Sequence, residues 1–128
     1  MPRILLIEDN YRLLRLHTRV LQNAGYDVYP AAAYYAALDM FRLYGQFSLC
    51  ISDVEVGNYD PMLLMRDLNN IRKRHTTPML LMSAQMENYQ PMANMLHLPL
   101  LEKPFTNDIL VAQVRELATV EMNASRVS

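Results

Sequence analysis

The sequence has 128 residues, a formal net charge of −1 and an apolar content of 52%. These values describe one ordinary globular domain and exclude an intrinsically disordered chain. Basic residues cluster only at positions 72–74, so the basic face typical of nucleic-acid-binding domains is absent. No apolar run is long enough to span a bilayer, and Glu8 follows the apolar residues 4–7 too soon for a signal peptide. The single cysteine, Cys50, can form no internal disulfide, which favours a reducing, cytoplasmic setting.

Hydrophobic periodicity predicts five strands that alternate with five helices. Strands are expected at residues 3–7, 27–29, 47–52, 79–82 and 97–101. Helices are expected at residues 11–24, 31–44, 61–75, 91–96 and 107–120, the fourth of them short and poorly specified. His17 lies on the apolar stripe of the first helix, which favours a half-buried imidazole with satisfied hydrogen bonds over a ligand. The alternation predicts an α/β fold of three layers, in which helices cover both faces of a parallel sheet.

Four strand ends carry polar side chains that a parallel sheet would bring to one edge. They are Glu8-Asp9, Asp53, Ser83 and Lys103. Asp53 alone would more often be a turn former or a helix cap, and it is the other strand ends that change the interpretation. Three carboxylates brought together repel one another unless a cation lies among them, and Mg²⁺ prefers such oxygen ligands. A carboxylate nucleophile, a divalent cation, an ammonium group and a hydroxyl are the parts needed to take up a phosphoryl group.

In this arrangement the sequence resembles the receiver domains of two-component response regulators, such as the chemotaxis regulator CheY. The matching motifs are Ile7-Glu8-Asp9, Ser52-Asp53, Ser83-Ala84 and Lys103-Pro104-Phe105. The resemblance extends through Val120 and implies a CheY-like, flavodoxin-like doubly wound sheet with strand order 2-1-3-4-5. We expect a receiver domain over residues 1–121 and a polar C-terminal tail over residues 122–128.

The resemblance implies that Asp53 is the phosphoacceptor of a phosphorelay. The phosphoryl group would come from a phosphohistidine on a sensor histidine kinase or a phosphotransfer protein. Asp9 and Asp53 would bind Mg²⁺ directly, Glu8 through water, and Glu55 through its backbone carbonyl. The domain would catalyse only its own phosphorylation and dephosphorylation, so it would not be an enzyme acting on external substrates.

The resemblance also assigns the phosphoryl pocket. Lys103 and the hydroxyl of Ser83 would hold the phosphoryl oxygens, Ala84 would leave room for them, and the bond before Pro104 would be cis. Phosphorylation would remodel the face made by the fourth helix, the fifth strand and the fifth helix. That face could bind a downstream protein partner or a second copy of the chain in a homodimer; no direct contact with nucleic acid or membrane is expected.

The sequence departs from the family at three places. Gly57, Asn58 and Pro61 change the loop after Asp53, and Pro61 restricts the preceding residue to extended backbone. Leu100 occupies the aromatic switch position, three residues before Lys103, and brings no hydroxyl. The fourth helix is expected to be shortened or irregular because the short segment between Ser83 and Lys103 holds two prolines.

Two further residues are expected to tune the lifetime of the phosphorylated state. Glu55 lies two residues after the phosphoacceptor and Gln85 two residues after Ser83. In the family, these positions flank the path of the attacking water.

Two other functions fit parts of the sequence. Leu100, the altered loop and the fourth helix favour a pseudo-receiver, an interaction module that works without phosphate, whereas the complete set of polar strand ends opposes it. The second is a Mg²⁺-dependent aspartyl phosphatase with Glu55 as its general acid, for which the chain offers no lid or substrate pocket. The chain could be a stand-alone receiver or the receiver part of a longer protein with an output domain.

Overall fold

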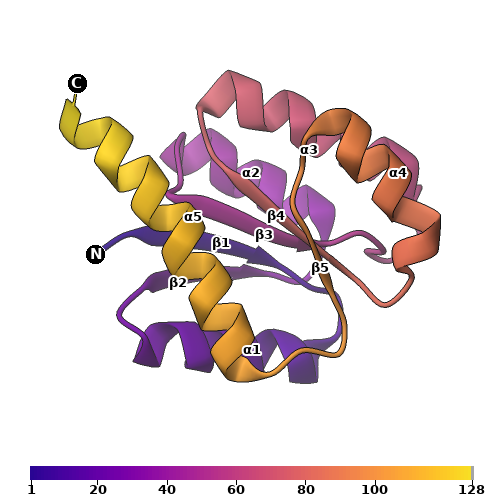
Figure 1. Cartoon of the computed structure of the whole chain (residues 1–128), viewed down its shortest axis with the longest axis horizontal. Helices are drawn as coiled ribbons and strands as arrows, with labels where there is room; N and C mark the ends of the chain where they lie inside the picture. The colour runs from indigo at the N-terminus through magenta and orange to yellow at the C-terminus, as the bar shows by residue number, and fades with distance from the viewer. Residues whose placement is uncertain (128) are drawn as a thin grey trace.

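The computed structural model describes the backbone of residues 1–127 and the side chains of residues 1–118. The strands are β1 (Arg3–Ile7), β2 (Asp27–Ala31), β3 (Leu49–Asp53), β4 (Met79–Ser83) and β5 (Leu100–Glu102). The helices are α1 (Tyr11–Asn23), α2 (Tyr34–Tyr44), α3 (Pro61–His75), α4 (Met86–Leu96) and α5 (Asn107–Val127). The strands form one parallel sheet in the order β2-β1-β3-β4-β5, which confirms the predicted α/β fold and its strand order (Figure 1).

Helices cover both faces of the sheet, with α1 and α5 on one side and α2, α3 and α4 on the other (Figure 1). Because side chains alternate across a strand, β1 supplies Leu5 and Ile7 to the core beneath α2–α4, and Ile4 and Leu6 to the core beneath α1 and α5. All four are fully buried. Burying such side chains contributes roughly 1.5–3 kcal/mol each, which holds the central strands in register.

Local signals begin α1 and α3 at their predicted positions, whereas α2 begins at Tyr34, three residues later than predicted. The side chain of Asn10 caps α1 by accepting a hydrogen bond from the amide of Leu13 at 3.1 Å. Asp60 caps α3 by accepting from the amide of Met62 at 2.9 Å, and Pro61 is the first helical residue. Asp60 has extended backbone (φ −61°, ψ 121°), as expected for a residue before proline.

The fourth helix is longer than predicted and is regular enough to include Pro91. It begins at Met86, because Tyr89 and Ala93, one turn apart, are both buried against the core while Pro91 is exposed. The carbonyl that loses its hydrogen bond to Pro91 belongs to Glu87, which is also exposed and can bind water. The prediction of a short fourth helix was therefore wrong.

The fifth strand is shorter than predicted and the fifth helix is longer. His97 ends α4 in the left-handed conformation (φ 58°), so the strand begins only at Leu100. Helix α5 continues to Val127, beyond its predicted end at residue 120, because no glycine or proline interrupts it. The predicted tail from residue 122 is thus helical as far as Val127; Ser128 lies outside the described residues. Within the described part of the chain, no helix is long and apolar enough to cross a bilayer.

Candidate functional site

Three carboxylates meet at the carboxyl edge of the sheet. Glu8 and Asp9 directly follow β1, and Asp53 is the last residue of β3. The pairing of Ile7 with Ser52 brings these strand ends side by side, so one carboxylate oxygen from each acid lies within 4.8 Å of the others. Glu8 and Asp53 are buried, whereas Asp9 is exposed. The predicted acidic cluster is therefore present, with one ligand open to solvent.

Lys103 supplies a positive charge to this cluster. Its ammonium nitrogen Nζ lies 3.3 Å from Oε2 of Glu8 and forms a second ion pair with Oδ1 of Asp53. Its backbone N–H donates to the carbonyl of Ser83 at 2.9 Å, which joins the ends of β4 and β5. The bond between Lys103 and Pro104 is cis, as the resemblance implied.

The charges of the cluster do not balance, because three carboxylates face one ammonium group. Burial raises the pKa of Asp53 above its usual value of 3.8; Lys103 opposes this shift and Glu55 adds to it. A second cation would relieve this repulsion. An oxygen-only donor set with one solvent-exposed carboxylate fits a hard divalent ion such as Mg²⁺, which keeps part of its water shell.

The raised pKa predicts a pH-dependent stability difference between the wild type and Asp53→Asn. Below pH 3.8 the carboxyl group of Asp53 is mostly protonated in both the folded and the unfolded chain, so its burial costs no charge-related stability. As the pH rises through the folded pKa, the folded state must bury a charge, so the wild type loses stability that the variant keeps. We expect Asp53→Asn to be the more stable at pH 7 in a chelator. Urea unfolding between pH 4 and pH 8 measures the difference, and equal stabilities throughout would contradict it.

The hydroxyl of Ser83 lies at the end of β4. Its oxygen accepts a hydrogen bond from the amide of Gln85 at 2.9 Å, and the residue is buried. Because this bond uses an oxygen lone pair, the hydroxyl proton stays available for donation. Ala84 and Gln85 are both exposed at the mouth of the site, and Glu55 is exposed after β3. The roles assigned to these three residues stay predictions.

The loop after Asp53 contains a contact that sequence reasoning missed. The amide of Gly57 donates to Oδ2 of Asp9 at 2.9 Å. Gly57 has φ +57°, in the left-handed region that glycine adopts without strain. The glycine that departs from the family pattern was visible in the sequence, but its bond to an acid 48 positions away was not.

His17 is more deeply buried than the predicted half-buried imidazole, and one of its ring nitrogens lacks a protein partner among the described residues. Among the described residues, its Nδ1 atom has no hydrogen-bond partner, and its ring stacks on that of Phe105 with centroids 5.3 Å apart. Burial lowers the pKa of His17, and the positive charge of Lys103 lowers it further, so both favour the neutral imidazole. His17 and Lys103 both line a cavity of about 260 Å³ between α1 and the loop after β5. The hydrogen bond expected for the imidazole is therefore not found at Nδ1 among the described residues.

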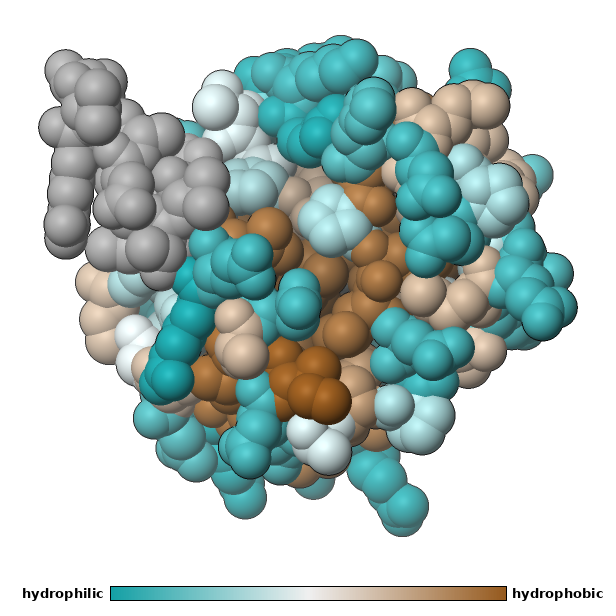
Figure 2. Space-filling model, viewed as in Figure 1, coloured by the Kyte–Doolittle hydropathy of each residue, from teal (hydrophilic) through white to brown (hydrophobic). Residues whose placement is uncertain are grey.

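The position of the family's aromatic switch is a half-buried leucine. Leu100 packs against the core beneath α2–α4. Figure 2 shows apolar surface gathered over β5, between α4 and α5. This is the face predicted to bind a partner.

Comparison with known proteins agrees with this geometry. The profile of the response regulator receiver domain matches residues 4–115. The transcriptional regulatory protein YxdJ of Bacillus subtilis (strain 168) is 29% identical over 118 residues, which cover 90% of this chain and 49% of that protein. The chain thus spans about half the length of this curated relative.

Two solved structures show the same fold. A CheY-like response regulator receiver domain protein from Methanospirillum hungatei JF-1 superimposes with a TM-score of 0.82 at 20% identity, covering 97% of this chain and 98% of that one. Full-length FixJ from B. japonicum also gives a TM-score of 0.82, at 23% identity, covering 98% of this chain and 61% of that one.

Proposed function

This chain belongs to the family of response regulator receiver domains of two-component systems, and from that premise we propose that Asp53 is its phosphoacceptor. The observation that carries the proposal is the convergence of Glu8, Asp9, Asp53 and Lys103 at one edge of the sheet. The phosphoryl donor would be a phosphohistidine on a sensor histidine kinase or a phosphotransfer protein. The domain would work in the cytoplasm, which agrees with its single, buried, unpaired Cys50.

In this proposal, a carboxylate oxygen of Asp53 attacks the phosphorus atom in line with the leaving imidazole. An O–P bond forms as the N–P bond breaks, and the imidazole nitrogen keeps the electron pair. In the structure the ammonium of Lys103 is paired with Asp53 and Glu8. During the transfer it would move to a phosphoryl oxygen, and the hydroxyl of Ser83 would donate to another. Positioning and charge neutralisation would supply most of the rate enhancement.

The acidic cluster would hold one Mg²⁺ ion. Asp9 and Asp53 would be direct ligands, the backbone carbonyl of Glu55 a third, and Glu8 would bind through water. When bound, the ion would neutralise charge on the incoming phosphoryl oxygens.

Phosphate would shift the domain between two conformations only if it bonds better in one of them. Leu100 cannot donate a hydrogen bond, so any switch in this chain would work by repacking of apolar side chains. The apolar surface over β5 supports a protein partner or a homodimer at the α4–β5–α5 face (Figure 2). The two full-length relatives extend beyond the matched region, which supports an output domain in a longer protein.

Phosphoryl uptake with and without Mg²⁺ tests this function. Intact mass is measured after incubation of the wild type with a small phosphodonor, in excess Mg²⁺ or in EDTA. We expect one labile phosphoryl group in Mg²⁺ and at least a tenfold slower gain in EDTA, because the carboxylates then repel the incoming phosphate.

The pseudo-receiver is the second candidate, favoured by Leu100 and by the rebuilt loop at Gly57. A folded protein that gains no mass in Mg²⁺ would support it. The aspartyl phosphatase is the third, suggested by Glu55 two residues after Asp53. Sustained release of phosphate from a generic phosphomonoester would support the phosphatase.

The lifetime of the phosphorylated state should depend on Glu55 and Gln85. Both are exposed at the mouth of the site, where they can order or exclude the attacking water. We expect Glu55→Ala and Gln85→Ala to change the dephosphorylation rate by about two- to tenfold, a change of up to about 1.4 kcal/mol in the barrier. Decay of the phosphorylated mass with time measures it, with exposed Glu116→Ala on α5 as the matched control. Unchanged rates in both variants would refute the role.

A further inference from the structure

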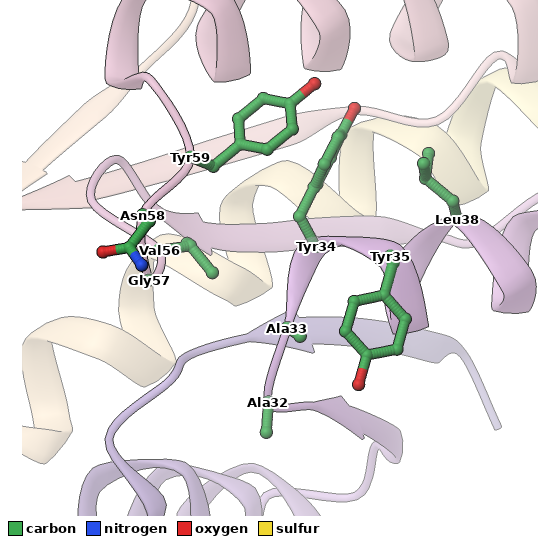
Figure 3. Close-up of a pocket in the computed structure, with 9 residues that line it drawn as sticks. All are labelled: Ala32, Ala33, Tyr34, Tyr35, Leu38, Val56, Gly57, Asn58 and Tyr59. Atoms are coloured by element: carbon green, nitrogen blue, oxygen red, sulfur yellow. The ribbon is translucent and has the colours of Figure 1, made fainter.

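A second cavity, of about 330 Å³, shares no lining residue with the His17 cavity (Figure 3). Its walls come from the loop between β2 and α2 with the start of α2, and from the loop between β3 and α3. The lining residues are Ala32, Ala33, Tyr34, Tyr35, Leu38, Val56, Gly57, Asn58 and Tyr59. The cavity is large enough for a molecule of one or two rings.

The lining selects for an uncharged, apolar ligand. None of the nine residues carries a charge, and three of them are tyrosines. The space exists because Ala32, Ala33 and Gly57 have small side chains or none. A Cβ atom built on Gly57 would meet no heavy atom within 4 Å, so this part of the wall is open. The amide of Asn58 offers a polar group at the rim (Figure 3).

Two of the three aromatic rings are already fixed. The rings of Tyr34 and Tyr59 pack together with centroids 4.7 Å apart, and the hydroxyl of Tyr59 is anchored by donating to Asp67 at 2.5 Å. Tyr34 is buried, whereas Tyr35 is 74% exposed and can move over a ligand. A preformed aromatic wall lowers the entropic cost of binding a flat molecule, and ring contacts add energy beyond the buried area.

The same wall is bonded to the acidic cluster. Gly57 lines the cavity, and its amide donates to Oδ2 of Asp9 at 2.9 Å. A ligand against Gly57 would hold this loop in one arrangement and so hold the Asp9 carboxylate. Asp9 is the exposed member of the cluster, so core packing does not hold its side chain as it holds those of Glu8 and Asp53.

We propose that this cavity binds a small, uncharged, planar aromatic molecule, and that its occupancy is linked to cation binding at the acidic cluster through the Gly57–Asp9 hydrogen bond. The linkage, but not the binding, rests on the Mg²⁺ site proposed above. Since linkage is reciprocal, the cation must change the affinity for the aromatic ligand by the same factor.

Binding is tested first with indole as the probe, in EDTA, by amide chemical shifts of the full chain. We expect saturable shifts concentrated at residues 32–35 and 56–59, with a smaller one at Asp9. Ala33→Leu should abolish them by filling the cavity at an extended backbone position (φ −149°), and Ala112→Leu, at an exposed alanine on α5, should not. Non-saturating or dispersed shifts in the wild type, or full binding by Ala33→Leu, would overturn the site.

A second variant keeps the test valid if Ala33→Leu folds poorly. Tyr35→Ala removes an exposed ring and should weaken indole binding about two- to tenfold. Tyr11→Ala removes a ring of matching exposure, 73% against 74%, from α1 and should change nothing. Equal indole affinities in these two variants would count against the cavity.

The linkage is tested by the Mg²⁺ dissociation constant with and without saturating indole. We expect a change of about fivefold or more, the usual lower range for coupled sites. An unchanged constant with indole bound would overturn the linkage alone. If Mg²⁺ does not bind at all, the proposed cation site fails, and the indole measurement in EDTA is unaffected.

Discussion

Asp53→Asn is expected to take up no phosphoryl group from a small phosphodonor in Mg²⁺, whereas the wild type gains one. An amide oxygen is a much weaker nucleophile than a carboxylate oxygen, and the change also removes one direct cation ligand. The side chains have nearly the same shape, so the fold should survive. Lys103 keeps Glu8 as a partner at 3.3 Å. Intact mass after a fixed incubation measures the effect, and circular dichroism confirms folding.

A matched control distinguishes the loss of the nucleophile from the general effect of removing one carboxylate. Asp39→Asn makes the same change at an exposed position on α2, outside the acidic cluster. It should gain mass like the wild type. If Asp53→Asn gained as much phosphoryl group as the wild type, another residue would be the acceptor and the assignment of Asp53 would be wrong.

Lys103→Met should slow phosphoryl uptake by about a hundredfold. Its ammonium group is paired with both Glu8 and Asp53, so it stands where negative charge gathers during transfer. Removing one preorganised donor from such a site typically costs about 10²- to 10³-fold in rate. Methionine keeps much of the apolar length of the lysine stem, which limits the loss of packing. The time course of mass gain in saturating Mg²⁺ measures the rate.

The chain offers a matched control in its only other lysine. Lys73 is exposed on α3, and Lys73→Met changes the net charge by the same amount. If Lys73→Met slows uptake as much as Lys103→Met, the effect is one of overall charge and not of the ion pairs. If neither variant is slower, Lys103 plays no part in the transfer.

The sheet and its site were readable from the sequence because both depend on short-range patterns. Residues 4–7, 49–51 and 79–82 are wholly apolar and each run is followed at once by a polar residue, and in a parallel sheet all such ends lie at one edge. The predicted meeting of Glu8, Asp9, Asp53 and Lys103 follows from strand order alone. It required no knowledge of any side-chain contact.

The fourth helix failed as a prediction because its start depends on burial. Pro91 lowers the local preference for a helix, but the packing of Tyr89 and Ala93 on the core outweighs it. Helix propensity is a weak guide wherever an apolar face is available to bury. The strand after His97 is shorter than its apolar sequence suggested for another reason, since His97 ends α4 in the left-handed conformation and β5 begins only at Leu100.

By itself, then, the sequence determined the α/β class, the strand ends and the chemical groups at the site, since these depend on periodicity and residue type. Only the tertiary structure decided which groups touch. The Gly57–Asp9 bond, the stacking of His17 on Phe105 and the tyrosine-lined cavity all join segments that lie far apart along the chain. Such contacts depend on the relative placement of loops and helices, which no local pattern of residues encodes.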